Sequence, residues 1–455
     1  MGRPAAAPAG RDTAATGAAP GRRWWAGLGL LAALAGCATT GAPEASWHTG
    51  AVGAVRAEST RQVMVTLSSS STEQSNRYGW ELEQRYRLQV VYAWDLQALG
   101  ARCLVFRIPN DMPLPLIVRQ LTADPRVAVA QPVQWFNVLG AGPRVGEGQG
   151  RPAGDADPYQ HLQHGMEELG LDEAHRMATG RGVTIAVIDT GIDVEHPDLL
   201  GRIQVARNFV RHGRGSFARE IHGTAVAGII AAGRNGHGII GVAPEAQVMA
   251  LKACWQIGRS ASRAVCNSYT LALALDYAIS HGAKIINFSL TGPQDPILAQ
   301  LIDVGHRQGV FMVAAAESHQ TSFPASLATV LAVVCDSTEG SGAQVAEALG
   351  APGIDILTTM PGGSWDFVSG SSFAAAHISG VSALLLERLP GLEPEALAAL
   401  LRRSGGSRSP DALGTVDAKA ALHEALADAS FGDRLRPGPH LVTSETPTGP
   451  PTQPR

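Results

Sequence analysis

The sequence predicts an α/β fold in which helices cover both faces of a parallel sheet, preceded by a small α+β domain. Within residues 158–427, short apolar stretches such as "GVTIAVI" and "AKIINFSL" alternate with longer helical stretches such as "SYTLALALDYAIS". Continuous apolar strands that alternate with helices are typical of a parallel sheet buried on both faces. In such sheets the reactive side chains gather beyond the carboxyl ends of the strands.

The elements of residues 158–427 follow in a regular order. After the strand "GVTIAVIDTG" comes a helix of small residues, "GTAVAGIIAAG", and then the strand "AQVMALKAC". Periodicity predicts two further helices, "SYTLALALDYAISHG" and "PILAQLIDVGHRQG", with the strand "AKIINFSL" between them. The strands "VFMVAAA" and "ATVLAVVCDS" precede the helix "SSFAAAHISGVSALLLERL".

Residues 61–139 predict the small α+β domain. "RQVMVTL" and "ARCLVFRI" have the composition of strands, and "RVAVAQPVQWFNVL" predicts a last strand. "STEQSNRYGWELEQRY" and "PLPLIVRQLTADP" predict two helices. Residues 140–157 are rich in Gly and Pro and predict a flexible linker, whereas residues 428–455 predict a disordered tail.

Residues 1–37 predict an export signal. Arg22 and Arg23 precede the apolar run "WWAGLGLLAALAGC", which is too short to span a bilayer comfortably. The run ends in Leu-Ala-Gly-Cys37, which resembles a bacterial lipobox, in which the cysteine is lipidated and becomes the mature N-terminus. An ordinary signal peptide cut nearby is the alternative. The small, polar residues 38–60 predict a tether, so we expect an exported lipoprotein, anchored in a bacterial membrane and facing the periplasm or the cell surface.

Composition narrows the class of protein. Of the 455 residues, 45% are hydrophobic and 17% are charged, which predicts a globular core rather than a disordered chain. The formal net charge of −4 argues against nucleic acid as a partner, because no strong basic field is present to hold phosphates. Five cysteines are too few for a disulfide scaffold.

Three polar residues stand at positions where chemistry is expected. Asp189 ends an apolar strand, His222 opens the helix of small residues, and Ser372 lies where a loop becomes a helix. Singly, each has a simpler explanation: a turn-forming Asp, a surface His at a helix start, and a Ser that caps a helix. A serine at a helix N-terminus also suits a nucleophile that generates an oxyanion, because the helix dipole favours negative charge there.

Together these contexts resemble the subtilisin-like serine peptidases. "AVIDTGID", "HGTAVAG" and "SGSSFAAAHISG" carry Asp, His and Ser in the subtilisin order. "HPDL", "GIIGVAP", "INFSL", "FPAS" and "APGIDILT" also match, so the resemblance covers nearly all of residues 158–427. It implies that Ser372 rather than Ser371 attacks a protein or peptide substrate, that His222 takes its proton, and that Asp189 orients the imidazole, with no cofactor for the chemistry.

The resemblance breaks at the expected oxyanion hole. Where the family has Ala-Ala-Ala-Gly-Asn, this chain has "VAAAES", so that Glu317 replaces the glycine and Ser318 replaces the asparagine. In subtilisin itself, loss of that amide costs on the order of 10² to 10³ in turnover. Ser318 is therefore the candidate oxyanion donor. The alternative function is a weakened or inactive peptidase fold that binds a partner or only processes itself.

The resemblance implies further sites. Ser289, Leu290 and Thr291 would bind substrate, with Thr291 in place of a glycine. Asp198 and Asn235 fall at calcium-ligand positions, so a structural calcium is expected there, with a plain turn as the alternative. Residues 61–139 resemble a propeptide domain, which would assist folding and block the cleft until it is cut.

Two expectations follow from export. An oxidising compartment favours a disulfide between Cys254 and Cys266, which bracket a short loop. A lipid on Cys37 would lie upstream of the propeptide-like domain. Cleavage in the linker would then detach the peptidase from its membrane anchor, and retention would depend on the propeptide-like domain staying bound.

Overall fold

The computed structural model describes residues 61–68, 71–140, 157–210, 216–257, 263–317, 322–335, 348–406 and 415–435, which all belong to one compact unit. The predicted signal, lipidation site and tether lie outside these residues, as do Ser318 and most of the predicted linker.

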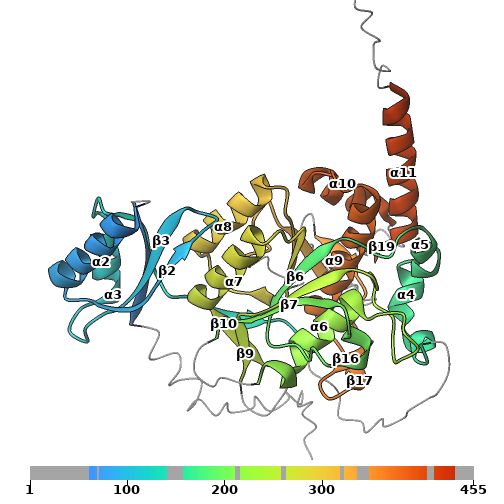
Figure 1. Cartoon of the computed structure of the whole chain (residues 1–455), viewed down its shortest axis with the longest axis horizontal. Helices are drawn as coiled ribbons and strands as arrows, with labels where there is room; N and C mark the ends of the chain where they lie inside the picture. Colours follow the sequence, from blue (N-terminus) through green and yellow to red (C-terminus); the bar gives the residue numbers. More distant parts are fainter. Residues whose placement is uncertain are drawn as a thin grey trace, which may run out of the picture. The chain divides into compact units, whose positions relative to one another are not determined.

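The large sheet has nine strands, in the order β18-β19-β15-β14-β13-β11-β6-β8-β7 (Figure 1). Neighbouring strands from β7 to β19 pair in parallel, and only the last pair, β18 with β19, is antiparallel. The prediction of a parallel α/β sheet is confirmed. Its strands are β6 (Thr184–Asp189), β7 (Ile203–Asn208), β8 (Gln247–Lys252), β11 (Ile285–Phe288), β13 (Phe311–Ala315), β14 (Leu331–Cys335), β15 (Leu349–Ala351), β18 (Gly405–Gly406) and β19 (Thr415–Val416).

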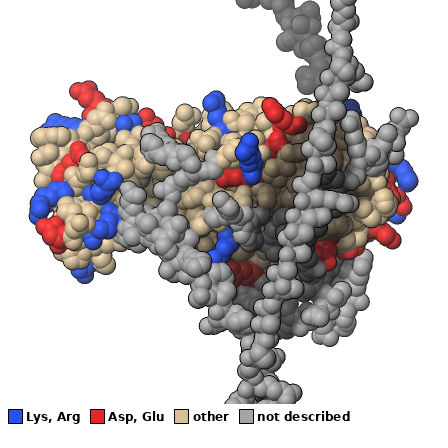
Figure 2. Space-filling view, turned by 90° about the horizontal axis from the view of Figure 1, so that it is seen from below, with Lys and Arg blue, Asp and Glu red and all other residues tan. Residues whose placement is uncertain are grey.

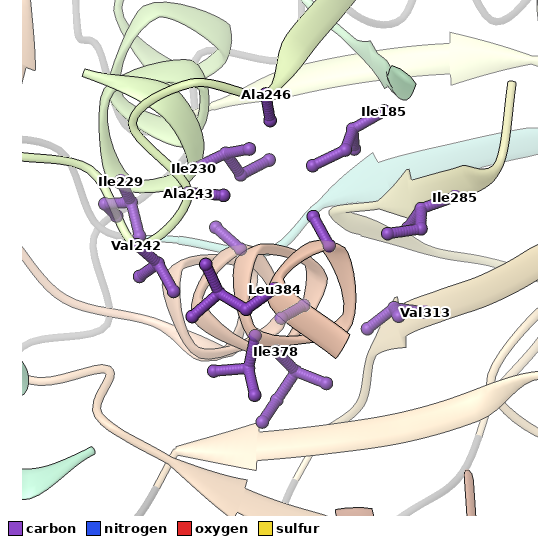
Figure 3. Packing of buried hydrophobic residues seen from close by; sticks show 14 of the residues in the cluster. Ile185, Ile229, Ile230, Val242, Ala243, Ala246, Ile285, Val313, Ile378 and Leu384 are labelled. Carbon is purple, nitrogen blue, oxygen red and sulfur yellow. The ribbon is translucent and has the colours of Figure 1, made fainter. Parts of the chain in front are cut away.

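Both faces of the inner strands of this sheet are buried, which explains why strands such as β13 and β14 are continuously apolar, whereas the edge strand β7 is mostly exposed. In β6, Ile185 and Val187 join the core beneath the helices α6 (Ile221–Ala231) and α9 (Ser371–Arg388). The alternate residues of the same strand join the core on the other side, beneath α7 (Ser268–Ser280) and α8 (Pro296–Arg307). Figure 3 shows α9 packed between α6 and the strands.

The N-terminal α+β domain has its own antiparallel sheet, in the order β2-β3-β1-β4. One face packs against the two helices, with Val63, Leu82 and Ile117 in a shared core. Residues of the opposite face, such as Met64, join the core of the larger α/β domain near α7. The elements are β1 (Gln62–Leu67), α2 (Thr72–Tyr86), β2 (Gln89–Leu96), β3 (Ala101–Arg107), α3 (Leu114–Thr122) and β4 (Val127–Pro132).

Polar contacts also join the two domains. The backbone N–H of Ala98 donates to Asp276 Oδ1 at 2.8 Å, and the N–H of Ile297, at the start of α8, donates to Gln131 Oε1 at 3.0 Å. The rings of Tyr92 and Tyr269 stack with their centroids 4.4 Å apart.

The predicted last strand of this domain is wrong as a single element. It divides into β4 and β5 (Trp135–Val138), and β5 belongs to a different sheet, in the order β12-β5-β10-β9. Pro132, which has no N–H to donate, is the last residue of β4. The N–H of Gln134 then donates to Ser268 Oγ of the larger α/β domain at 2.8 Å, so the chain passes from one domain to the other.

The remaining elements surround the large sheet. Helix α11 continues past Ala427, where we predicted the end of the domain, and the predicted tail beyond residue 435 lies outside the described residues. These elements are η1 (Gln160–Leu162), α4 (His164–Glu168), α5 (Leu171–Met177), η2 (Pro197–Leu199), η3 (Phe217–Arg219), β9 (Cys254–Gln256), β10 (Ala264–Asn267), β12 (Leu290–Thr291), β16 (Ile356–Met360), β17 (Ser364–Val368), α10 (Pro394–Ser404) and α11 (Ala418–Leu435).

The helices and the surface charges show no membrane-spanning or single-sign feature in the described residues and on the face shown in Figure 2. Within the described part of the chain, the helices are too short or too polar to cross a membrane. On the face shown in Figure 2, Lys and Arg side chains are interspersed with Asp and Glu side chains.

Candidate active site

Asp189 is the last residue of β6, an inner strand of the large sheet, and is 1% exposed. Its Oδ1 accepts the N–H of Thr190 at 2.6 Å, and both carboxylate oxygens contact His222 Nδ1, at 2.8 and 2.9 Å. Because a carboxylate can only accept hydrogen bonds, Nδ1 of His222 carries the hydrogen. Nε2 is then the basic nitrogen of this imidazole.

His222 is held by the packing of the first turn of α6 against the loop that follows Asp189. The N–H of Gly223 donates to Thr190 Oγ1 at 2.9 Å, and a Cβ on Gly223 would lie 2.7 Å from the carbonyl oxygen of Gly191. A glycine is therefore needed for this close approach. His222 Nε2 is buried and has no hydrogen-bond partner among the described residues.

Ser372 is the second residue of α9 and is fully buried. Its hydroxyl donates to the carbonyl oxygen of Ser289 at 3.1 Å rather than to His222. The neighbouring Phe373 ring lies 5.3 Å from the imidazole of His222, between centroids. The structure thus brings Asp189 and His222 into contact and places the Phe373 ring, next in sequence to Ser372, near the imidazole. The Ser372 hydroxyl points to the carbonyl of Ser289, directly before β12.

The end of the N-terminal domain runs past this site. The N–H of Leu139 donates to the carbonyl oxygen of Ser289 at 3.1 Å. Val138 and Asn137 pair with Leu290 and Thr291 in antiparallel register. The three residues predicted to bind substrate therefore lie along residues 137–139.

Gly140, the next residue, lies against the imidazole and the start of α9. A Cβ on Gly140 would lie 3.1 Å from His222 Nε2 and 3.1 Å from Phe373 Cε2. A Cβ on Gly370, at the N-cap of α9, would lie 2.6 Å from the Gly140 Cα. The Leu139–Gly140 peptide is therefore next to the polar groups that we predicted to be catalytic.

Comparison with known proteins identifies this arrangement. The sequence profile of the subtilase family matches residues 180–432, more than half of the chain. The chain belongs to the subtilase family. The predicted resemblance to subtilisin-like serine peptidases is confirmed.

Individual relatives match over part of their length. An intracellular serine protease of Paenibacillus polymyxa is 33% identical over 270 residues, covering 53% of this chain and 80% of that protein. Subtilisin E of Bacillus subtilis (strain 168) is 32% identical over 246 residues, covering 51% of this chain and 62% of that protein. Fervidolysin of Fervidobacterium pennivorans is 30% identical over 284 residues, covering 53% of this chain and 40% of that protein.

The crystal structure of fervidolysin also resembles the fold. It matches with a TM-score of 0.64 over 80% of this chain and 60% of that chain, at 24% identity. At this identity the likeness shows the fold alone.

A buried ion pair in this subtilase was not foreseen from the sequence. Glu220, the N-cap of α6, is paired with Lys252, and its Oε2 also accepts the N–H of Gly191 at 2.5 Å. Burial lowers the pKa of Lys252, whereas Glu220 and the charge of Asp189 oppose this shift. The pair fixes the loop after Asp189 to the helix of His222. Its sequence signal is a Lys inside an apolar strand and a Glu two residues before the His.

The predicted calcium ligands are used in other ways. Asp198 Oδ2 accepts the indole N–H of Trp365 at 2.7 Å and the N–H of Ile239 at 3.1 Å. Asn235 Oδ1 accepts the N–H of His237 at 3.0 Å, within its own loop. Burial raises the pKa of Asp198 to about 7, and its Oδ1 is buried without a hydrogen-bond partner among the described residues.

This environment does not fit a calcium ion, which needs six to eight oxygen ligands. Within the described residues, no three His, Cys, Asp or Glu side chains are grouped as metal ligands. The N–H groups of Trp365 and Ile239 bond only Oδ2 of Asp198. No step of the reaction proposed below uses calcium.

Two other predicted sites have different outcomes. A disulfide joins Cys254 to Cys266. The oxyanion candidate Ser318 is outside the described residues, but its neighbour Glu317 is described and exposed.

Proposed function

We propose that this subtilase is a serine endopeptidase that cleaves peptide bonds through Asp189, His222 and Ser372. The proposal rests on the hydrogen bonds and the neighbours of the His222 imidazole. Its Nδ1 is held by both oxygens of Asp189, and its buried Nε2 lies beside Gly140, which follows the strand β5 that is paired with Leu290 and Thr291.

The proposed reaction begins with rotation of the Ser372 hydroxyl from the Ser289 carbonyl toward His222. Nε2 of His222 takes the hydroxyl proton while Oγ bonds to the carbonyl carbon of the substrate, and the imidazolium is stabilised by Asp189. The C–N bond then breaks, and the proton passes from Nε2 to the departing amine. A water molecule repeats the sequence on the acyl-enzyme and releases the acid.

The developing oxyanion requires donors. The N-terminus of α9 offers a positive dipole and backbone N–H groups at Ser372. The Ser318 hydroxyl is the second donor in this proposal. Because serine reaches less far than the asparagine it replaces, we expect turnover below that of subtilisin.

We also propose that the first substrate is the chain itself, at the Leu139–Gly140 bond. Leu139 is bonded to the Ser289 carbonyl and Gly140 adjoins His222 Nε2, as expected for residues on the two sides of a bond to be cut. This places the cut at the first bond of the predicted linker. It separates residues 61–139 from the peptidase domain and, with a lipid on Cys37, frees the peptidase from a covalent anchor. Export and lipidation rest on the sequence of residues 1–37.

The second candidate is a peptidase fold that is silent or processes only itself. It is favoured by the replaced oxyanion asparagine and by the Ser372 hydroxyl, which donates to Ser289.

A fluorophosphonate probe separates the two candidates, because it reacts only with an activated serine. We expect wild type to gain one probe per chain at Ser372, and Ser372→Ala and His222→Ala to gain none. Labelled wild type that also hydrolyses casein supports the endopeptidase. Labelling without casein hydrolysis supports a protein that processes only itself, and no labelling of wild type refutes both proposed activities.

A further inference from the structure

The disulfide joins β9 and β10 of the four-stranded sheet β12-β5-β10-β9, which we call the small sheet. Of these two strands, β10 also pairs with β5, within residues 135–139, which we call the segment. Cys254 is in β9 and Cys266 is in β10, directly opposite each other in antiparallel register. On its other edge β10 pairs with β5, where Cys266 lies opposite Phe136. Phe136, Cys266 and Cys254 thus form one row across three strands.

This row is buried and apolar. All three residues are 0% exposed and belong to the same core cluster, together with Leu290 and Phe323. The rings of Phe136 and Phe323 lie 6.0 Å apart between centroids. If Leu139 precedes the cleaved bond, Phe136 is the fourth residue before it, and it pairs with Cys266 of the strand that carries the disulfide.

The outer strand also contacts the segment. The ring of Trp255 in β9 meets Trp135 edge-on, with the centroids 5.6 Å apart. β9 is in turn fixed to the base of the site, because Lys252 Nζ donates to the Cys254 carbonyl at 3.1 Å. A continuous set of contacts therefore leads from the Glu220–Lys252 pair, through β9 and the disulfide, to β10.

When residues 135–139 dissociate after cleavage, β10 loses its strand partner β5 on one edge. Its described strand partner is then β9, through three residue pairs and the disulfide. A short strand with one partner is a weak template, because isolated two-stranded pairs are marginally stable in water. The covalent link keeps β10 in register for the next chain.

We propose that the Cys254–Cys266 disulfide is a positioning element for extended substrates, which it holds at the fourth and fifth residues before the cleaved bond. The proposal rests on the proposed peptidase function. It predicts that the disulfide matters for long peptides that reach β10 and β9, and not for short peptides that reach only β12.

The test compares two p-nitroanilide substrates on self-processed protein: Trp-Phe-Asn-Val-Leu, copied from residues 135–139, and the dipeptide Val-Leu. For Cys254→Ala/Cys266→Ala, we expect kcat/KM on the long substrate to fall about tenfold, mainly through KM, since a few cross-strand pairs are lost. On the dipeptide we expect a change below about twofold. The matched control is Cys335→Ala, at a cysteine of the peptidase domain that is outside the disulfide.

Wild-type protein reduced with a phosphine and then reoxidised provides the same comparison without a mutation, in case the double variant does not fold. Fluorophosphonate labelling of Ser372 shows whether the catalytic residues still function in each protein. An equal loss on both substrates shows a purely structural role and overturns the proposal, as does an unchanged long-substrate KM. If wild type neither labels nor cleaves the dipeptide, the proposed function fails instead.

Discussion

The large sheet and the small sheet β12-β5-β10-β9 differ in how they are built. The inner strands of the large sheet are parallel, and their residues are buried on both faces between helices. The small sheet consists of strands of two to four residues, and β5, one of its inner strands, comes from the N-terminal domain. The first holds Asp189 and positions the helices of His222 and Ser372. The second pairs β5, the end of the N-terminal domain, between β12 and β10.

This difference suggests that the large sheet determines stability and the small sheet determines peptide binding. Substitutions in the large sheet should change the free energy of unfolding. Substitutions in the small sheet should change which peptides are held, with little effect on folding.

The largest effect on stability is expected in the large sheet. Ile285→Ala, in the central strand β11, removes a fully buried side chain and should lower the free energy of unfolding by about 2–5 kcal/mol. Urea unfolding measures it. The control, Leu200→Ala at a residue 61% exposed, should change it by less than about 0.5 kcal/mol. Equal changes in the two variants would contradict the assignment of the core.

Acid should weaken the same core through His377 of α9. Burial lowers the pKa of His377 to about 4, below the ordinary value of 6.5. Between these two pH values the unfolded chain binds the proton more tightly. The contribution of His377 to stability is therefore complete above pH 6.5, and falls by about 3 kcal/mol as the pH drops to 4.

The measurement is the difference in unfolding free energy between wild type and His377→Gln at several pH values. The difference should change in favour of the variant as the pH falls from 6.5 to 4. A difference that stays constant over this range would show that His377 is protonated equally in both states.

Strands β6, β8, β11, β13 and β14 of the large sheet could be predicted because each is a largely apolar run, and Asp189, His222 and Ser372 lie in long, ordered motifs. The edge strand β7 (IQVARN) could not, because polar residues interrupt it. The small sheet could not, since strands as short as Leu290–Thr291 have no periodicity and their partners are distant in the sequence. The Glu220–Lys252 pair and the Trp365 indole on Asp198 were missed for the same reason. Tertiary contacts alone bring those side chains together.

A smaller effect is expected in the small sheet from Gly292→Val. Any Cβ at residue 292 would overlap the ring of Phe136. We expect at least about tenfold weaker kcat/KM on the peptide Trp-Phe-Asn-Val-Leu and no change on the same peptide with Ala in place of Phe. After self-processing, which removes Phe136 from the peptidase chain, unfolding in urea should shift little. If both peptides lose equally, Phe136 does not mark a binding position.

The smallest effect is expected from removal of calcium. Because Asp198 is bonded by N–H groups of Trp365 and Ile239, a chelator should change Tm by less than about 1 °C. Thermal unfolding with EDTA, compared with added calcium, measures this. A rise of several degrees with calcium would restore the predicted metal site.

The most direct test of the account is the N-terminal sequence and intact mass of the purified protein. The account predicts that wild type contains a chain beginning Gly-Ala-Gly-Pro at residue 140, and that Ser372→Ala remains uncut. A cut at the same bond in Ser372→Ala, or a wild-type protein that labels with fluorophosphonate yet begins at another residue, would contradict the placement of Leu139–Gly140 at the proposed catalytic serine.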